Sequence, residues 1–347
     1  MADDAVSLLA ELAICPSAED PEELALMRDV TRATSEARRP STMVRYQAPW
    51  EQFTAWCSQR KPPRCSLPAL ASTVVLYLQF VANSAASYSV VKAASAAIYT
   101  AHSCALVPDE LNPTKSPGAK LVRKAAQDRL GTFTRGKKEP VEVEHVIAIA
   151  VLYCPMAGFT LQSLMVGTMI AVMFAGFLRF DCAVKIFADE VRFLDTHMEM
   201  FMETRKNVKL RQGDVLVIAK GSGPACPYAL TARLVAAAGL KDVHVPLFQG
   251  FDGRKDNAPL SGAAMKYSQC RQLVLKALER VLGLPRSEVT KLFGTQSLRA
   301  GGATCVAHDV PDRVFQRHGA WASAEIKNEY VKDTLDVRLA VTKAMGL

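Results

Sequence analysis

The sequence predicts a mainly α-helical protein with a small antiparallel β-sheet, arranged as a helical domain followed by an α+β domain. Half of its 347 residues are apolar, which is enough to bury two hydrophobic cores. Apolar side chains recur every three to four positions through most of the chain, as they do in amphipathic helices. Residues 189–221 differ, because polar and apolar residues alternate there, as is typical of strands.

We interpret residues 1–34 as an acidic extension that is helical and interrupted at Pro16 and Pro21. The four-helix domain that follows should span residues 35–130. Ser41 or Thr42 can cap its first helix. One face of that helix carries Tyr46, Trp50, Phe53, Trp56 and Cys57. The next three helices are expected at 69–83, 89–105 and 117–131, and the last of them is basic.

Residues 131–142 predict a linker between the domains, because Gly, Pro and a Lys137–Lys138 pair occur there without apolar periodicity. The second domain, 143–347, should open with two strongly apolar helices. Three short strands follow, at 189–195, 197–204 and 214–221. The turn between the second and third strands is basic, with Arg205, Lys206, Lys209 and Arg211. Helices then return and continue to the region around Tyr330.

The charge is unevenly distributed along the chain. Residues 1–30 hold eight of the 34 acidic residues and one of the 42 basic ones. The rest of the chain therefore has 41 basic and 26 acidic residues, a net charge of +15. Such a basic body indicates a polyanionic partner, although a charge that serves solubility alone is an equal alternative at this point.

The cysteines and the apolar runs exclude several classes of protein. Nine dispersed cysteines without a C-x-x-C pair argue against a disulfide framework and against a zinc site. The longest apolar run, residues 169–177, is too short to cross a bilayer. The first residues, MADDAVSLLAELAI, lack the basic and then apolar pattern of a secretory leader. We therefore expect an intracellular protein without a membrane span.

Five residues of the second domain invite a chemical explanation. Arg179 interrupts an apolar helix, so a buried ion pair with Asp181 is one interpretation. Arg299 follows a turn and lies in the first turn of a helix, where an anion is favoured. Gly301 and Gly302 then allow a close backbone approach. The other three are Lys206 on the basic turn, Trp321, and Tyr330 in a polar neighbourhood. A solvated lysine and an exposed tyrosine are the plain alternatives for Lys206 and Tyr330.

In this order, the five residues make the sequence resemble the tyrosine recombinase (integrase) family. The resemblance rests on AGFLRFD, TRKNVKLRQGD, QSLRAGGAT, RHGAW and NEYVKD, and it extends from about residue 35 to the end. The separations also fit: 120 residues from Arg179 to Arg299, 31 from Arg299 to Tyr330, and nine from Trp321 to Tyr330. The motifs SLRAGGAT and HGAW are most similar to those of eukaryotic mobile-element recombinases of the DIRS and Crypton type.

The resemblance implies a function in DNA recombination and integration by a transposable element. Residues 35–130 would be the core-binding domain, and 143–347 the catalytic domain with a C-terminal tail that docks on a neighbouring protomer. The partners would be double-stranded DNA and further copies of the chain, as a homotetramer on two DNA sites. No cofactor and no metal would be needed, and the protein would be nuclear if its source is eukaryotic. Expected DNA-binding residues are Arg123, Lys124, Lys137, Lys138, Arg205, Lys209 and Arg211.

The resemblance also implies a role for each site residue. Tyr330 would attack the phosphodiester and form a 3′-phosphotyrosyl link. Arg179 and Arg299 would bind the phosphate oxygens, because a planar guanidinium matches a phosphate. Lys206 would donate a proton to the leaving 5′-oxygen, and Trp321 would hydrogen-bond at the phosphate.

The sequence departs from the family pattern at two positions. Gln296 stands where a histidine is usual, and glutamine cannot titrate. Cys182 stands where an acidic residue is common, with Asp181 one position earlier. His318 could support the site in place of the missing histidine. Two functions therefore stay open: an active recombinase, and a catalytically impaired DNA-binding descendant.

Overall fold

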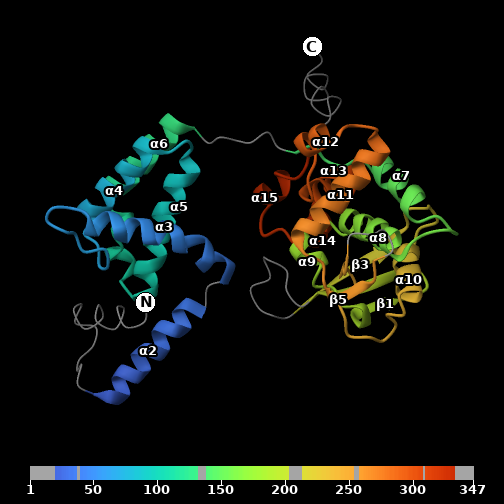
Figure 1. Cartoon of the computed structure of the whole chain (residues 1–347), viewed down its shortest axis with the longest axis horizontal. Helices are drawn as coiled ribbons and strands as arrows, with labels where there is room; N and C mark the ends of the chain where they lie inside the picture. Colours follow the sequence, from blue (N-terminus) through green and yellow to red (C-terminus); the bar gives the residue numbers. More distant parts are fainter. Residues whose placement is uncertain are drawn as a thin grey trace, which may run out of the picture. The chain divides into compact units, whose positions relative to one another are not determined.

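A computed structural model of the chain describes residues 20–36, 40–131, 138–202, 213–253, 258–307 and 309–332. The chain divides into two compact units, residues 1–135 (unit 1) and residues 136–347 (unit 2), drawn in Figure 1. No helix within the described ranges is long and apolar enough to cross a membrane.

The described residues of unit 1 form helices joined by loops and contain no strand (Figure 1). Its helices are α2 (Pro21–Glu36), α3 (Pro40–Ser58), α4 (Ala71–Ser84), α5 (Tyr88–Cys104) and α6 (Pro117–Leu130), with short 3₁₀ turns η1 (Asp109–Leu111) and η2 (Pro113–Lys115). Helix α3 begins at Pro40, so Ser41 and Thr42 lie inside it and neither is its N-cap. Helix α6 begins as sequence rules suggest, because the Ser116 hydroxyl accepts from the Ala119 amide and Pro117 occupies the first position.

The core of unit 1 forms on the aromatic face predicted for α3. Phe53 is fully buried and packs against Tyr77 of α4, with 4.9 Å between ring centroids. Trp56 packs against the same tyrosine at 5.3 Å. His102 of α5 is also buried, and its Nε2 accepts a hydrogen bond from the Ala69 amide at 2.9 Å. Burial lowers the pKa of His102, although its bond to the Ile98 carbonyl opposes the shift.

Unit 2 combines helices with two small antiparallel sheets. Its helices are α7 (Val143–Tyr153), α8 (Leu161–Ala175), α9 (Phe180–Ala183), α10 (Pro227–Ala237), α11 (Tyr267–Leu282), α12 (Arg286–Leu292), α13 (Gln296–Val306), α14 (Asp312–His318) and α15 (Ala324–Asn328), with the 3₁₀ turn η3 (Ala188–Glu190). The strands are β1 (Val191–Phe193), β2 (His197–Met202), β3 (Asp214–Ala219), β4 (Gln249–Phe251) and β5 (Leu260–Ala264).

The three strands predicted from alternation form one sheet in the order β1-β2-β3. Its register pairs Met200 of β2 with Val191 on one side and with Leu216 on the other. Met198, Met200 and Met202 are buried, and the residues between them are more exposed. The prediction of a mainly helical chain with a small antiparallel sheet is therefore confirmed. The β4-β5 pair was not predicted from the sequence.

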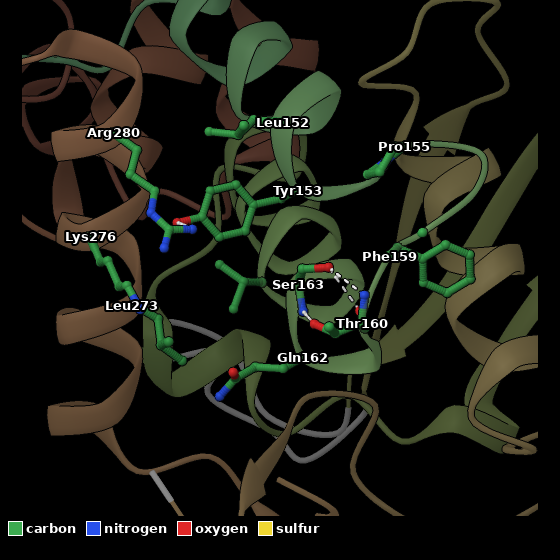
Figure 2. A pocket seen from close by; sticks show the side chains of 12 residues that line it. Leu152, Tyr153, Pro155, Phe159, Thr160, Gln162, Ser163, Leu273, Lys276 and Arg280 are labelled. Carbon is green, nitrogen blue, oxygen red and sulfur yellow. Dashed lines mark hydrogen bonds between the residues drawn. The ribbon is translucent and has the colours of Figure 1, made fainter. Parts of the chain in front are cut away.

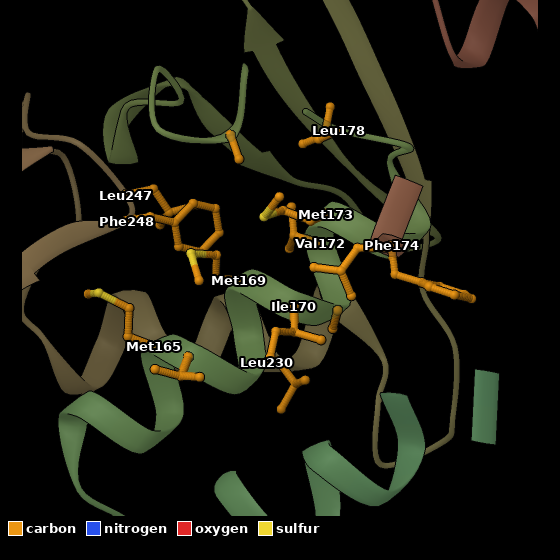
Figure 3. Packing of buried hydrophobic residues seen from close by; sticks show 14 of the residues in the cluster. Met165, Met169, Ile170, Val172, Met173, Phe174, Leu178, Leu230, Leu247 and Phe248 are labelled. Carbon is orange, nitrogen blue, oxygen red and sulfur yellow. The ribbon is translucent and has the colours of Figure 1, made fainter. Parts of the chain in front are cut away.

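The core of unit 2 surrounds α8, which is buried on every side. Figure 3 shows Met169 of α8 next to Phe248, and Ile170 next to Leu230 of α10. Helix α8 packs against α7, α10 and α13 (Figure 1). Thr160 caps its start, since its hydroxyl accepts from the Ser163 amide at 3.0 Å. The site is built from the segment that follows the end of this buried helix.

Candidate active site

The segment after α8 turns sharply and places Arg179. Helix α8 ends at Ala175, and Phe177 adopts a φ of +47°. Arg179 then becomes the N-cap residue of α9. The expectation that Arg179 interrupts a continuous helix is wrong, because the positive φ at Phe177 ends the helical path before the arginine.

Arg179 and Tyr330 are in direct contact, although 151 positions separate them in the sequence. Nη2 of Arg179 donates to the hydroxyl oxygen of Tyr330 at 3.0 Å. No carboxylate of a described residue forms an ion pair with Arg179, and Asp181 is exposed. The interpretation of Arg179 as half of an ion pair with Asp181 is therefore wrong.

Arg299 is the most deeply buried charge of the site, with 3% of its surface exposed. It lies on α13, and its Nη1 donates to the Phe177 carbonyl while Nη2 donates to the Gly319 carbonyl at 2.7 Å. These bonds help to offset the cost of burying the charge, and they join α13 to two other segments. Its guanidinium carbon also lies 4.6 Å from the ring centroid of Trp321 and 4.8 Å from that of Tyr330, as in cation–π contacts.

Glycines allow α13 to approach α8 closely enough for this arrangement. A Cβ at Gly301 would collide with the Val141 carbonyl, and one at Gly302 with the Phe174 carbonyl. The close backbone approach predicted from the Gly-Gly pair therefore occurs at two places: Gly302 approaches the end of α8, and Gly301 approaches Val141, just before α7.

Trp321 is buried within an aromatic cluster. Its ring lies 5.8 Å from Phe177, 5.1 Å from Phe315 and 5.8 Å from Tyr330 between centroids. The indole Nε1 is buried and has no hydrogen-bond partner among the described residues. Trp321 also lines an open pocket of about 480 Å³, to which α14 contributes Arg313 and Arg317. A buried donor without a partner among the described residues is suited to a ligand oxygen.

Tyr330 is half-buried just beyond α15, and backbone contacts fix its position. Its amide donates to the Lys327 carbonyl at 3.0 Å, and its own carbonyl accepts from the Thr304 hydroxyl of α13 at 3.4 Å. Thr304 follows Arg299 by little more than one helical turn. The tyrosine and the arginine are therefore positioned by the same helix.

Gln296, which stands at the usual histidine position, and His318, considered as its substitute, lie on different helices, α13 and α14. His318 Nε2 bonds the Ala175 carbonyl at 2.8 Å, and its ring stands edge-on to Phe177 at 4.7 Å. His318 thus buttresses the turn that carries Arg179. Gln296 is exposed at the first position of α13, three residues before Arg299.

Four expected DNA-binding residues lie outside the described ranges: Lys137, Arg205, Lys209 and Arg211. Lys206, the expected proton donor, lies outside them as well. Lys138 is described, and its ammonium donates to the Thr290 and Lys291 carbonyls at 2.5 and 2.7 Å. Lys138 therefore holds the last turn of α12. In unit 1, Lys124 is exposed on α6, and Arg123 is half-buried nearby.

Figure 2 shows a second pocket of unit 2, of about 230 Å³, between α7, the start of α8 and α11. Its lining includes Tyr153 and Arg280, whose Nη1 donates to the tyrosine hydroxyl at 3.4 Å. None of the site residues described above lines this pocket. Within the described ranges, no group of three or more His, Cys, Asp or Glu residues is placed to hold a metal ion.

The sequence did not single out Phe177, Gly319 or Ala175, although their carbonyls hold Arg299 and His318. Backbone acceptors leave no trace in residue identity, so no sequence signal could have found them. Phe177 is an exception in part, because its aromatic ring in AGFLRFD also packs on Trp321.

The fold of the chain is similar to that of several solved structures. The chain is similar to the Tn1549 transposon integrase in complex with transposon right end DNA, at 12% identity and a TM-score of 0.54, over 92% of this chain and 99% of that one. It is also similar to the XerH site-specific recombinase in a post-cleavage complex with difH substrate, at 12% identity and 0.56, over 98% and 88%. A third is a lambda integrase dimer bound to a COC′ core site, at 13% identity and 0.52, over 89% and 95%.

These identities are low, so the likeness concerns the fold: the chain has the fold of these tyrosine recombinases and integrases. No family sequence model and no curated protein matches the sequence.

Proposed function

We propose that the chain is a site-specific DNA recombinase or integrase that cleaves and rejoins strands through a 3′-phosphotyrosyl intermediate on Tyr330. The observation that carries this proposal is the contact of the Tyr330 hydroxyl with Arg179, with Arg299 against the face of the same ring. A tyrosine whose hydroxyl contacts one guanidinium group and whose ring faces a second is an arrangement that a structural core does not require. Attack on a phosphodiester requires such a nucleophile close to positive charges that stabilise the phosphoryl oxygens.

The reaction can be written with these residues. The Tyr330 oxygen attacks phosphorus and loses its proton to water, the bond from phosphorus to the 5′-oxygen breaks, and that oxygen takes up a proton. Arg179 and Arg299 offset the negative charge that gathers on the phosphoryl oxygens, and the Trp321 Nε1–H donates to one of them. Lys206 supplies the proton to the 5′-oxygen. The phosphotyrosyl ester conserves the energy of the bond, so the reverse steps rejoin the strand without a nucleotide or metal cofactor.

The remaining parts of the proposal follow from the same family resemblance. Residues 35–130 act as the core-binding domain and residues 143–347 as the catalytic domain, with double-stranded DNA as substrate. A homotetramer on two DNA sites is the working assembly, and the C-terminal tail docks on a neighbouring protomer. The proposal also includes a relationship to the recombinases of DIRS and Crypton elements, and therefore a nuclear location of the protein.

A second candidate function is a DNA-binding protein that has lost cleavage. Two observations favour it. Gln296 replaces the usual histidine, and two N–H groups of Arg299 are bonded to the Phe177 and Gly319 carbonyls. On this alternative the fold and the charge serve binding alone.

The test is covalent trapping on nicked duplexes tiled across the DNA that flanks the protein's own gene. The full chain should give an SDS-resistant protein–DNA adduct, and Tyr330→Phe should give none while its DNA affinity stays nearly unchanged. Tyr228→Phe is the matched control, since Tyr228 is another half-buried tyrosine of unit 2 that packs on Phe193 and lies outside the site. An adduct that persists in Tyr330→Phe would assign the nucleophile elsewhere. Tight binding of the same duplexes without an adduct would favour the second candidate.

A further inference from the structure

Lys327 is a buried lysine that the reaction proposed above does not use. It lies on α15, three residues before Tyr330, and 7% of its surface is exposed. A lysine is seldom buried to this extent unless its charge is paired. Its Nζ forms an ion pair with the Asp312 carboxylate at the start of α14, and it lies 5.7 Å from the centroid of the Phe315 ring. The ammonium is therefore bound within the protein and is not presented to a DNA phosphate.

The backbone of Lys327 connects this ion pair to the proposed nucleophile. Its carbonyl accepts a hydrogen bond from the Tyr330 amide at 3.0 Å, so the two residues belong to one short turn. Helix α15 is only five residues long. A helix of this length is not stable by itself, so contacts with neighbouring elements must fix its position. A shift of Lys327 therefore shifts Tyr330 as well.

The side chain of Lys327 also contacts the aromatic cluster of the site. Phe315, next to its ammonium, packs on Trp321 with 5.1 Å between ring centroids. Trp321 in turn packs on Tyr330 at 5.8 Å. The ion pair with Asp312 thus fixes the helix that precedes the tyrosine, and it does so beside the rings that the tyrosine packs against.

The two members of the ion pair differ in their exposure. The Asp312 side chain is 67% exposed, whereas the Lys327 side chain is 8% exposed. Removal of the carboxylate alone would leave the lysine charge buried without its partner, which costs much more than replacing both charges by uncharged side chains. The contribution of the pair can therefore be separated from that of the packing around it.

We propose that Lys327 is a positioning residue of the recombinase site: paired with Asp312, it fixes α15 on α14 so that Tyr330 reaches Arg179 and faces Arg299. This inference rests on the proposed recombinase function, which makes Tyr330 the nucleophile. It adds two residues that act through the tyrosine and that have no contact with the DNA assigned to them.

The test measures the single-turnover rate of adduct formation by the full chain, at a temperature well below every unfolding midpoint. Asp312→Asn should slow adduct formation on the order of 10- to 100-fold, because a displacement of about 1 Å at a reacting group has an effect of this size. Its DNA affinity should stay unchanged. Asp312→Glu keeps the charge and should react at nearly the wild-type rate. The matched control is Glu279→Gln, which neutralises a carboxylate that pairs with Arg286 at 3.3 Å, outside the site.

The double variant Asp312→Asn with Lys327→Met tests the pair by rescue. Methionine is unbranched and packs well on aromatic rings, so it should lie on Phe315 without a buried charge and restore most of the lost rate. A pair that serves stability alone would lower the unfolding midpoint without slowing the folded protein. An Asp312→Asn rate equal to that of Glu279→Gln, or a double variant as slow as Asp312→Asn, would overturn the inference.

Hydrogen exchange of the amides of residues 324–330 measures the same positioning without DNA. These amides should exchange on the order of 10-fold faster in Asp312→Asn and return to the wild-type rate in the double variant. If the wild type forms no adduct, the proposed function is rejected, and equal exchange in Asp312→Asn and wild type would then overturn the inference too. If the wild type forms the adduct but Asp312→Asn reacts and exchanges like the control, the inference alone is rejected.

Discussion

Gly302→Ala should both destabilise unit 2 and disable the site, because this glycine sets the spacing between α13 and the end of α8. The added Cβ would lie within 3.0 Å of the Phe174 carbonyl oxygen, whereas ordinary contacts begin at 3.4 Å. Helix α13 would therefore have to move by about 1 Å. That movement would strain the bond from Arg299 to the Phe177 carbonyl, which joins the same two segments.

Two opposing effects set the magnitude. Alanine is better than glycine inside a helix by about 1 kcal/mol. Overpacking against a backbone group costs about 3 kcal/mol, at the upper end of the usual range, since a carbonyl cannot rotate away as a side chain can. The net loss is about 2 kcal/mol, or a fall of roughly 4–8 °C in the unfolding midpoint of a unit of this size. A displacement of about 1 Å at Arg299 should also cut the rate of adduct formation on the order of 100-fold.

Differential scanning calorimetry and the covalent trapping assay measure the two effects. Gly294→Ala is the matched control, because Gly294 precedes α13 and no atom lies within 4 Å of a Cβ built there. The control should change the free energy of unfolding by less than about 0.5 kcal/mol. A Gly302→Ala protein as stable and as active as Gly294→Ala would refute the account of how α13 is positioned.

Three further predictions concern the site and unit 1. Arg179→Lys keeps the charge but loses the planar fork, so adduct formation should fall on the order of 100-fold with little change in DNA affinity; an unchanged rate would show that charge alone suffices. Gln296→His should raise the cleavage rate if the site is only impaired, and single-turnover kinetics would reveal no gain if the pocket has adapted to glutamine. Unit 1 should lose stability as the pH falls below about 6.5, because the pKa of buried His102 is lowered on folding and the unfolded chain then binds the extra proton. A thermal midpoint of unit 1 that is the same at pH 7.5 and 5.5 would contradict that assignment.

The sequence predicted the helices and strands in which the buried residues recur at a regular spacing. Met198, Met200 and Met202 alternate with polar residues, and they form the buried face of β2. The aromatic face of α3 was equally clear, because Phe53 and Trp56 recur at helical spacing and are buried. The β4-β5 pair was missed because β4 is only three residues long and β5 is rich in small residues, so no alternation is visible in either strand.

The sequence predicted which residues form the site, but it predicted their geometry only in part. The order of Arg179, Arg299, Trp321 and Tyr330 singled out side chains that the structure brings together. The placement of Arg179 was wrong, because a positive φ at an aromatic residue such as Phe177 is rare and leaves no sequence signal. Contacts made by backbone carbonyls were equally invisible.

The most direct test of the central claim is mass spectrometry of the trapped adduct after digestion with trypsin and nuclease. The account predicts that the peptide 328–332, NEYVK, carries a nucleotide joined through its 3′-phosphate to the oxygen of Tyr330. Unmodified NEYVK in a purified adduct, with the nucleotide on a peptide from elsewhere in the chain, would contradict it.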